Sequence, residues 1–122
     1  MELALGLMLI FMSIVHVIYG EKKQVEVLKK STSDSVLIGS FRVMSLQGGI
    51  LLFAVGVIYI LSFIGVLPLT GTAAYFPVSI ILLNIFSLLI VAITKHKDLL
   101  KATVPQFIIF AIIVTLQILA IK

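Results

Sequence analysis

Four long apolar runs dominate this sequence, and they limit its possible folds more than any other feature. An α-helix needs about 20 apolar residues to cross the hydrocarbon core of a bilayer. Lipid offers no hydrogen-bond partners to a backbone, so the runs are predicted to be helices and not strands. The expected spans are residues 3–19, 43–64, 75–94 and 103–121 of a single integral membrane domain, residues 1–122.

The small share of charged residues supports the same assignment. Only 11% of the 122 residues are charged and 61% are hydrophobic, whereas about a quarter of a soluble domain is charged. A chain this apolar cannot cover its surface with polar groups, so we expect a lipid bilayer to surround it. The first run lacks the basic flank and the cleavage site of a signal peptide, so we expect it to be retained.

Basic residues gather on one side of the predicted spans. By the positive-inside rule, both loops that carry them are predicted to be cytoplasmic and both termini to lie outside. Because the connections are short, we expect an all-α, four-helix transmembrane bundle with up-down-up-down topology in the cell membrane. Eight of the nine basic residues lie in or beside these loops (Lys22, Lys23, Lys29, Lys30, Arg42, Lys95, Lys97 and Lys101), and the ninth is Lys122.

Composition and motifs exclude several classes of function. The net charge of +4 does not indicate nucleic-acid binding, because the basic residues flank apolar spans. Cysteine is absent, which excludes disulfides, thiol redox chemistry and thiolate metal sites. The sequence contains no nucleophile paired with a base and no set of metal ligands. We therefore expect no catalytic residue, no cofactor and no metal.

Small and polar residues recur along each run at intervals of three and four, the seam of left-handed helix packing. Polar groups are costly in hydrocarbon, so these stripes are predicted to face neighbouring helices. The four stripes are Glu2, Gly6, Leu9, Ser13, His16 and Gly20; Arg42, Ser45, Gly49, Leu52, Gly56 and Tyr59; Pro77, Ile80, Asn84, Ser87, Val91 and Thr94; and Thr103, Gln106, Phe110, Ile113, Gln117 and Ala120.

A candidate polar face inside the bundle comprises His16, Arg42, Ser45, Asn84 and Gln106. His16 is expected to bond Gln106 or a backbone carbonyl; the alternatives are a ligand contact or, least favoured, a metal site. Arg42 is expected to reach the membrane surface, with an anion or headgroup contact as the alternative. Asn84 is expected to link two helices.

Two glycines of the second run have a different predicted role. Gly49 and Gly56 lie on the same stripe, and glycine lets helix backbones approach closely in membranes. We expect both to pack against a neighbouring helix.

Short stretches resemble a known group of proteins. The run from His16 to Lys22 resembles the end of the first span in small four-span bacterial membrane proteins of unknown function, loosely DoxX-like. Gln47-Gly48 and the stretch from Lys101 to Gln106 are similar to such proteins as well. The aromatic residues and the second His or Asn often found in their second span are absent here. The resemblance implies a fold and no function.

Our leading hypothesis is a small, non-enzymatic accessory or interaction subunit of a larger membrane assembly. Its partners would be other membrane protein subunits or further copies of the chain. The alternative is a small-solute or lipid transporter or channel that uses the polar face as its path. A membrane enzyme is the least favoured hypothesis, and His16 with Arg42 would be its centre.

The charge distribution gives a testable prediction of topology. Because the basic residues fix the orientation, reporter tags at Met1 and at Lys122 should both be outside, and a tag in the turn from Ser31 to Ser35 should be cytoplasmic. Accessibility labelling of intact cells measures this. A mixed signal from any tag would indicate dual topology and contradict the prediction.

Overall fold

The computed structural model describes residues 1–121; Lys122, which we expected on the outer side, lies outside this range. Every element in the described range is helical, so the all-α prediction is confirmed. The number of membrane crossings and their direction stay predictions. The elements are α1 (Glu2–Tyr19), the π-helical turn η1 (Gly20–Val25), α2 (Glu26–Ser31), α3 (Ser35–Phe63), the 3-10 turn η2 (Gly71–Tyr75), α4 (Phe76–Thr94), α5 (Asp98–Ala102) and α6 (Val104–Ala120).

Three helical stretches are long and apolar enough to cross a membrane: Glu2–Ser31, Ser35–Phe63 and Gly71–Thr94. Helix α6 is also apolar, but it has only 17 residues. At about 1.5 Å per residue it is about 26 Å long, slightly less than the roughly 30 Å of a hydrocarbon core.

Local sequence signals explain where the helices begin. The Asp34 carboxylate caps α3 by accepting hydrogen bonds from the backbone N–H groups of Val36 and Leu37, at 3.0 and 3.3 Å. Pro77 and Pro105 lie in the first turns of α4 and α6, where a missing N–H costs no helical hydrogen bond.

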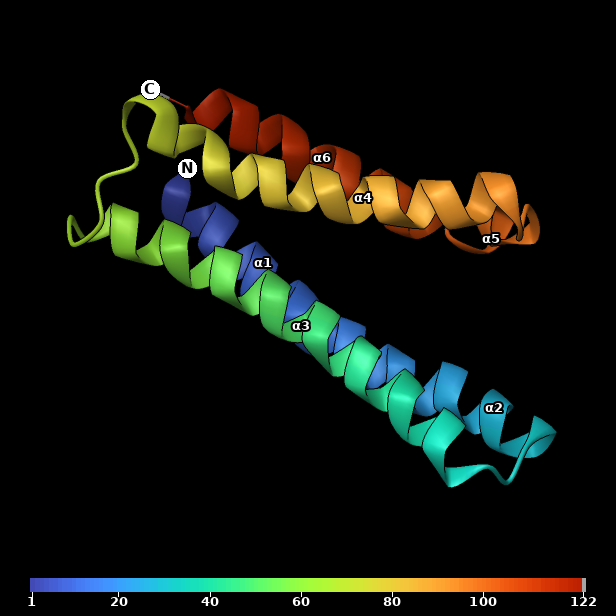
Figure 1. Cartoon of the computed structure of the whole chain (residues 1–122). Helices are drawn as coiled ribbons and strands as arrows, with labels where there is room; N and C mark the ends of the chain where they lie inside the picture. Colours follow the sequence, from blue (N-terminus) through green and yellow to red (C-terminus); the bar gives the residue numbers. More distant parts are fainter. Residues whose placement is uncertain (122) are drawn as a thin grey trace.

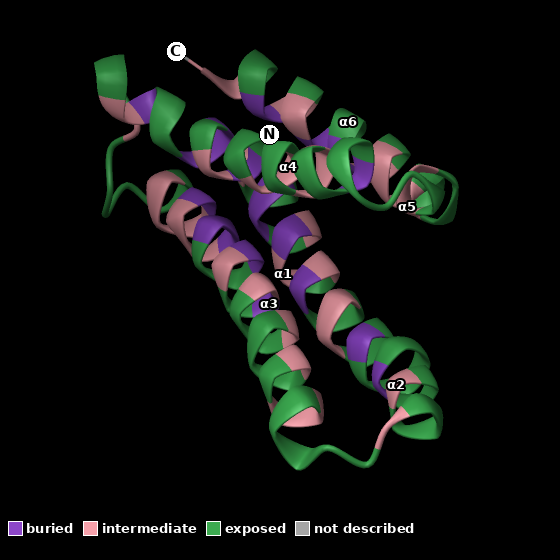
Figure 2. Cartoon of the chain, turned by 45° about the vertical axis from the view of Figure 1, so that its right-hand side comes forward, coloured by how far each residue is buried: buried purple, intermediate pink, exposed green. Residues whose placement is uncertain are grey.

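The helices form two antiparallel hairpins. One pairs the continuous helix α1–η1–α2 with α3, and the other pairs α4 with α6 (Figure 1). The hairpins meet where the N-terminus and the loop between α3 and α4 lie, which we call the closed end. They separate towards α2 and α5, which we call the basic end (Figures 1 and 2). Both lysine-containing loops lie at the basic end.

The first hairpin is held by a close approach of two backbones. A Cβ atom added at Gly56 would lie 2.8 Å from the carbonyl oxygen of Gly6 and 3.1 Å from the backbone nitrogen of Ile10. A Cβ at Gly49 would overlap the Val17 side chain. Both glycines are buried against α1, so the two helices can be this close only because side chains are missing there.

The first helix continues past the predicted end of the first span at Tyr19. Through η1 and α2 it remains helical to Ser31. Val25 lies in this extension and is completely buried, because η1 packs on α3. The hairpin is therefore about 45 Å long at about 1.5 Å per residue, so it extends beyond a hydrocarbon core of roughly 30 Å.

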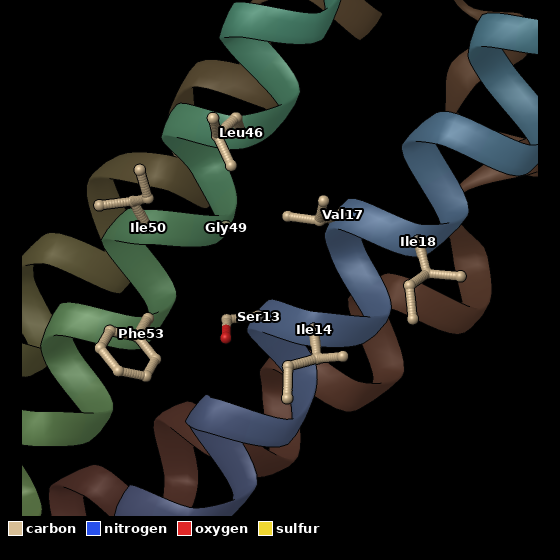
Figure 3. A pocket seen from close by; sticks show the side chains of 8 residues that line it. All are labelled: Ser13, Ile14, Val17, Ile18, Leu46, Gly49, Ile50 and Phe53. Atoms are coloured by element: carbon tan, nitrogen blue, oxygen red, sulfur yellow. The ribbon is translucent and has the colours of Figure 1, made fainter.

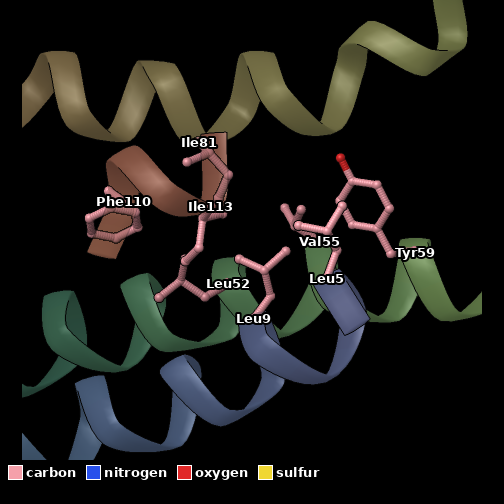
Figure 4. Packing of buried hydrophobic residues seen from close by; sticks show 8 residues of the cluster. All are labelled: Leu5, Leu9, Leu52, Val55, Tyr59, Ile81, Phe110 and Ile113. Atoms are coloured by element: carbon pink, nitrogen blue, oxygen red, sulfur yellow. The ribbon is translucent and has the colours of Figure 1, made fainter. Parts of the chain in front are cut away.

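The buried apolar cluster lies where the two hairpins meet. Figure 4 shows its side chains converging from α1, α3, α4 and α6. This packing joins the hairpins on one side of each helix and leaves the remaining apolar surface exposed, as expected for a protein embedded in lipid (Figure 2). The cluster comprises Leu5, Leu9, Leu52, Val55, Tyr59, Ile81, Phe110 and Ile113.

The predicted inward stripe of the third span is wrong in its second half. Ser87, Val91 and Thr94 are exposed, and the buried residue in this half of α4 is Ala92, which lies off the predicted stripe. The physical reason is the separation of the hairpins towards the basic end, where the first hairpin does not cover α4.

The close approach of α1 and α3 gives a stability prediction. Gly56→Ala should lower the free energy of unfolding by about 1–3 kcal/mol, because its methyl group meets backbone atoms that cannot rotate away. Denaturation of the purified protein in mixed detergent measures this. Gly39→Ala on the same helix is the matched control; nothing lies within 4 Å of its Cβ position, so its stability should be unchanged or up to about 1 kcal/mol higher. Equal effects of the two substitutions would contradict the packing.

Candidate functional site

An ion pair at the basic end bridges the two helices of the first hairpin. The Nε and Nη2 groups of Arg42 donate to the two carboxylate oxygens of Glu21, at 3.1 and 2.5 Å. Glu21 belongs to η1 and Arg42 to α3. The side chain of Glu21 is 49% exposed and that of Arg42 is 44% exposed. The pair therefore contributes only modestly to the stability of the fold. Its two-pronged geometry fixes the orientation of the guanidinium group.

His16 and Ser45 lie close to this ion pair, each against the opposite helix. The Nε2 atom of His16 lies 2.8 Å from the place that a Cβ of Gly48 would occupy. Ser45 covers buried Gly20, where the π-helical turn begins. Such π-turns occur frequently at functional sites. The structure thus places three members of the candidate face, His16, Arg42 and Ser45, together between α1–η1 and α3.

The other two members of the candidate face belong to the second hairpin. The Asn84 amide donates to the carbonyl of Ile80 on its own helix, at 3.2 Å, and not to another helix as we expected. Gln106 is half-buried at the start of α6 and forms no hydrogen bond with His16 among the described residues. The five predicted residues therefore do not form one continuous face.

Most hydroxyl groups in the apolar helices are also satisfied within their own helix. Ser87, Thr94 and Thr115 donate to carbonyls four residues earlier, at 2.6–2.9 Å. The Ser13 hydroxyl donates to the carbonyl of Ile10, three residues earlier. Within residues 1–121, no side-chain hydrogen bond or ion pair joins the two hairpins. Apolar packing supplies most of the contact between them, because local back-bonding has used most of the polar groups; the polar side chains that approach each other are those of Tyr59 and Gln117.

Gln117 is the exception, at the closed end. It is only 1% exposed, and neither its Nε2 nor its Oε1 atom has a hydrogen-bond partner. It lines a small pocket with Glu2 of α1 and buried Tyr59 of α3. An unpaired buried amide is costly, so this pocket is the second candidate polar site.

The polar residues at the basic end and those at the closed end lie on opposite sides of the apolar cluster. Leu9, Leu52 and Val55 occupy the levels between His16 and Tyr59 along the hairpin. Within the described residues, no group of three His, Cys, Asp or Glu side chains lies close enough to hold a metal ion. The arrangement can bind an anion at Arg42 or a hydrogen-bonding group at Gln117, each at its own end.

Two features of these sites do not follow from the predicted stripes. One is the pairing of Glu21 with Arg42, which flank the same turn and have opposite charges. Gln117 was placed correctly on an inward stripe, but its lack of a partner depends on how the hairpins pack. Only the first feature had a signal in the sequence.

The unpaired amide gives a second stability prediction. Gln117→Met should raise the free energy of unfolding by about 1–3 kcal/mol, because a side chain of similar shape then fills the pocket without an unsatisfied polar group. The same substitution at exposed Gln47 should change stability by less than about 0.5 kcal/mol. Detergent denaturation compares the two. A loss of stability in Gln117→Met would mean that the amide is hydrogen-bonded, against the prediction.

Comparisons with protein-family models, with curated proteins and with solved structures give no match to this chain. The resemblance of the run from His16 to Lys22 to small four-span, loosely DoxX-like proteins stays a prediction from the residues. Function must therefore be argued from the geometry of the chain itself.

Proposed function

We propose that the chain is a multi-pass protein of the cell membrane that serves as a non-enzymatic interaction subunit of a larger membrane assembly. The observation that carries this proposal is a shallow depression on the exposed face of α6, which we call the notch. Its volume is about 260 Å³, and Ala111, Ile112, Thr115 and Leu116 line it.

The residues of the notch suit a docking helix. Ala111 and Thr115 are exposed and four residues apart, the small-xxx-small spacing at which transmembrane helices pack closely. The Thr115 hydroxyl donates to the Ala111 carbonyl at 2.7 Å, so its hydrogen bond is already made within α6. A helix of another membrane protein can therefore contact the notch without leaving a polar group unpaired.

The length of α6 supports the same proposal. With 17 residues it is short for a membrane span, and one response to such mismatch is association with neighbouring helices. We place four crossings in the bilayer, with both basic loops cytoplasmic. The common position of these loops at one end of the molecule supports this topology (Figure 1).

Transport through the bundle has less support. A solute path would have to join the polar residues of the basic end to the pocket at Gln117. The apolar cluster that includes Leu9, Leu52 and Val55 separates them. The same separation gives no support to an enzyme centred on His16 and Arg42.

The notch provides the test. The tagged chain, purified from its native membranes in mild detergent, should hold a second membrane protein at a fixed stoichiometry. Ala111→Leu should reduce the amount of that partner, because the larger side chain fills the notch. An overlap cost of about 1–3 kcal/mol corresponds to roughly 5- to 150-fold weaker binding. Quantitative mass spectrometry measures the ratio of the two proteins.

Ala54→Leu is the matched control, since Ala54 is exposed on α3 and lies outside the notch. It should leave the partner bound. Two results would overturn the proposal: a wild-type chain that purifies alone or only with itself, or an Ala111→Leu chain that retains the partner as well as Ala54→Leu does.

A further inference from the structure

A groove runs between α1 and α3 on the side of the first hairpin that is turned away from α4 and α6 (Figure 3). Its volume is about 320 Å³. Ser13 and Gly49 are buried at its floor, and Ile14, Ile18, Ile50 and Phe53 are among the exposed side chains that form its walls.

The groove leads towards the ion pair at the basic end. Leu46, Ile50 and Phe53 follow one face of α3, and Arg42 lies one turn before Leu46 on that face. Glu21 holds the guanidinium group of Arg42 through Nε and Nη2. The Nη1 group has no partner among the described residues, and the side chain is about half exposed, so a donor remains free for an anion.

We propose that this groove binds an anionic phospholipid, with an acyl chain along α1 and α3 and the phosphate at Arg42. The groove is apolar at membrane depth, as an acyl chain requires. A cationic group lies at the end where the helices leave the hydrocarbon, as a phosphate requires. Lys22 and Lys23 add positive charge next to Glu21. The proposal depends on the membrane placement proposed above and not on the docking of a partner at α6.

The Glu21–Arg42 pair makes the proposal sharply testable. Glu21 competes with phosphate for the same guanidinium group, so Glu21→Gln should increase the affinity for phosphatidylglycerol. One basic residue near a membrane surface contributes about 1 kcal/mol to the free energy of binding an anionic lipid, which corresponds to about a fivefold change in affinity. Misfolding would expose apolar surface to both lipids, so it does not explain a gain that is confined to phosphatidylglycerol. Arg42→Gln should reduce the affinity by a similar factor, whereas Lys101→Gln, the loss of a positive charge in the other basic loop, should have no effect.

The groove itself has a matched pair of substitutions. Phe53→Ala removes a wall of the groove and should weaken the binding of phosphatidylglycerol and phosphatidylcholine alike, by several-fold. Phe86→Ala removes an exposed phenylalanine of α4 and should weaken neither.

Native mass spectrometry of the full chain in detergent measures these affinities, with the two lipids carrying the same acyl chains. The chain is produced in a heterologous host and used free of bound partners, so the outcome is independent of the interaction proposed for α6. We expect phosphatidylglycerol to bind more tightly than phosphatidylcholine, and glycerol phosphate, which has no acyl chains, to compete poorly. Equal binding of the two lipids, equal effects of Arg42→Gln and Lys101→Gln, or full competition by glycerol phosphate would each overturn the proposal.

Discussion

The close approach of two helix backbones at Gly6 and Gly56 is the contact on which the rest of the structure depends. A Cβ at Gly56 would lie 2.8 Å from the carbonyl oxygen of Gly6, so any side chain there would force the two backbones apart. This crossing turns α1 and α3 into one unit that extends to the basic end. The groove, the ion pair between Glu21 and Arg42 and the contact of His16 with Gly48 all lie between these two helices.

The second hairpin is attached in a different way. Within the described residues, no ion pair connects it to the first, and the apolar cluster at the closed end supplies most of the contact, with Tyr59 and Gln117 beside it. Dispersion contacts of this kind are not directional, so they constrain the angle between hairpins less than a polar network does. The same arrangement leaves most of the apolar surface of α4 and α6 for lipid or for another protein.

The sequence predicted the helices better than the way they assemble. The apolar runs located the helices, because this signal is local. Small residues at intervals of three and four located the sides of α1 and α3 that face each other, because these two helices pack along a single contact line. The same spacing gave the wrong face for the second half of α4, and Asn84 forms its hydrogen bond within its own helix. Both outcomes depend on the angle between the hairpins, which no local feature of the sequence encodes.

The separation of the hairpins can be measured directly in lipid. The chain has no cysteine, so spin labels can be placed at single engineered positions. One pair, at exposed Val43 and Ile93, reports on the basic end, and another, at exposed Phe63 and Ile118, reports on the closed end. Pulsed electron paramagnetic resonance in bilayers should give a longer distance at the basic end than at the closed end. Equal distances at both ends would show a parallel bundle and contradict the account.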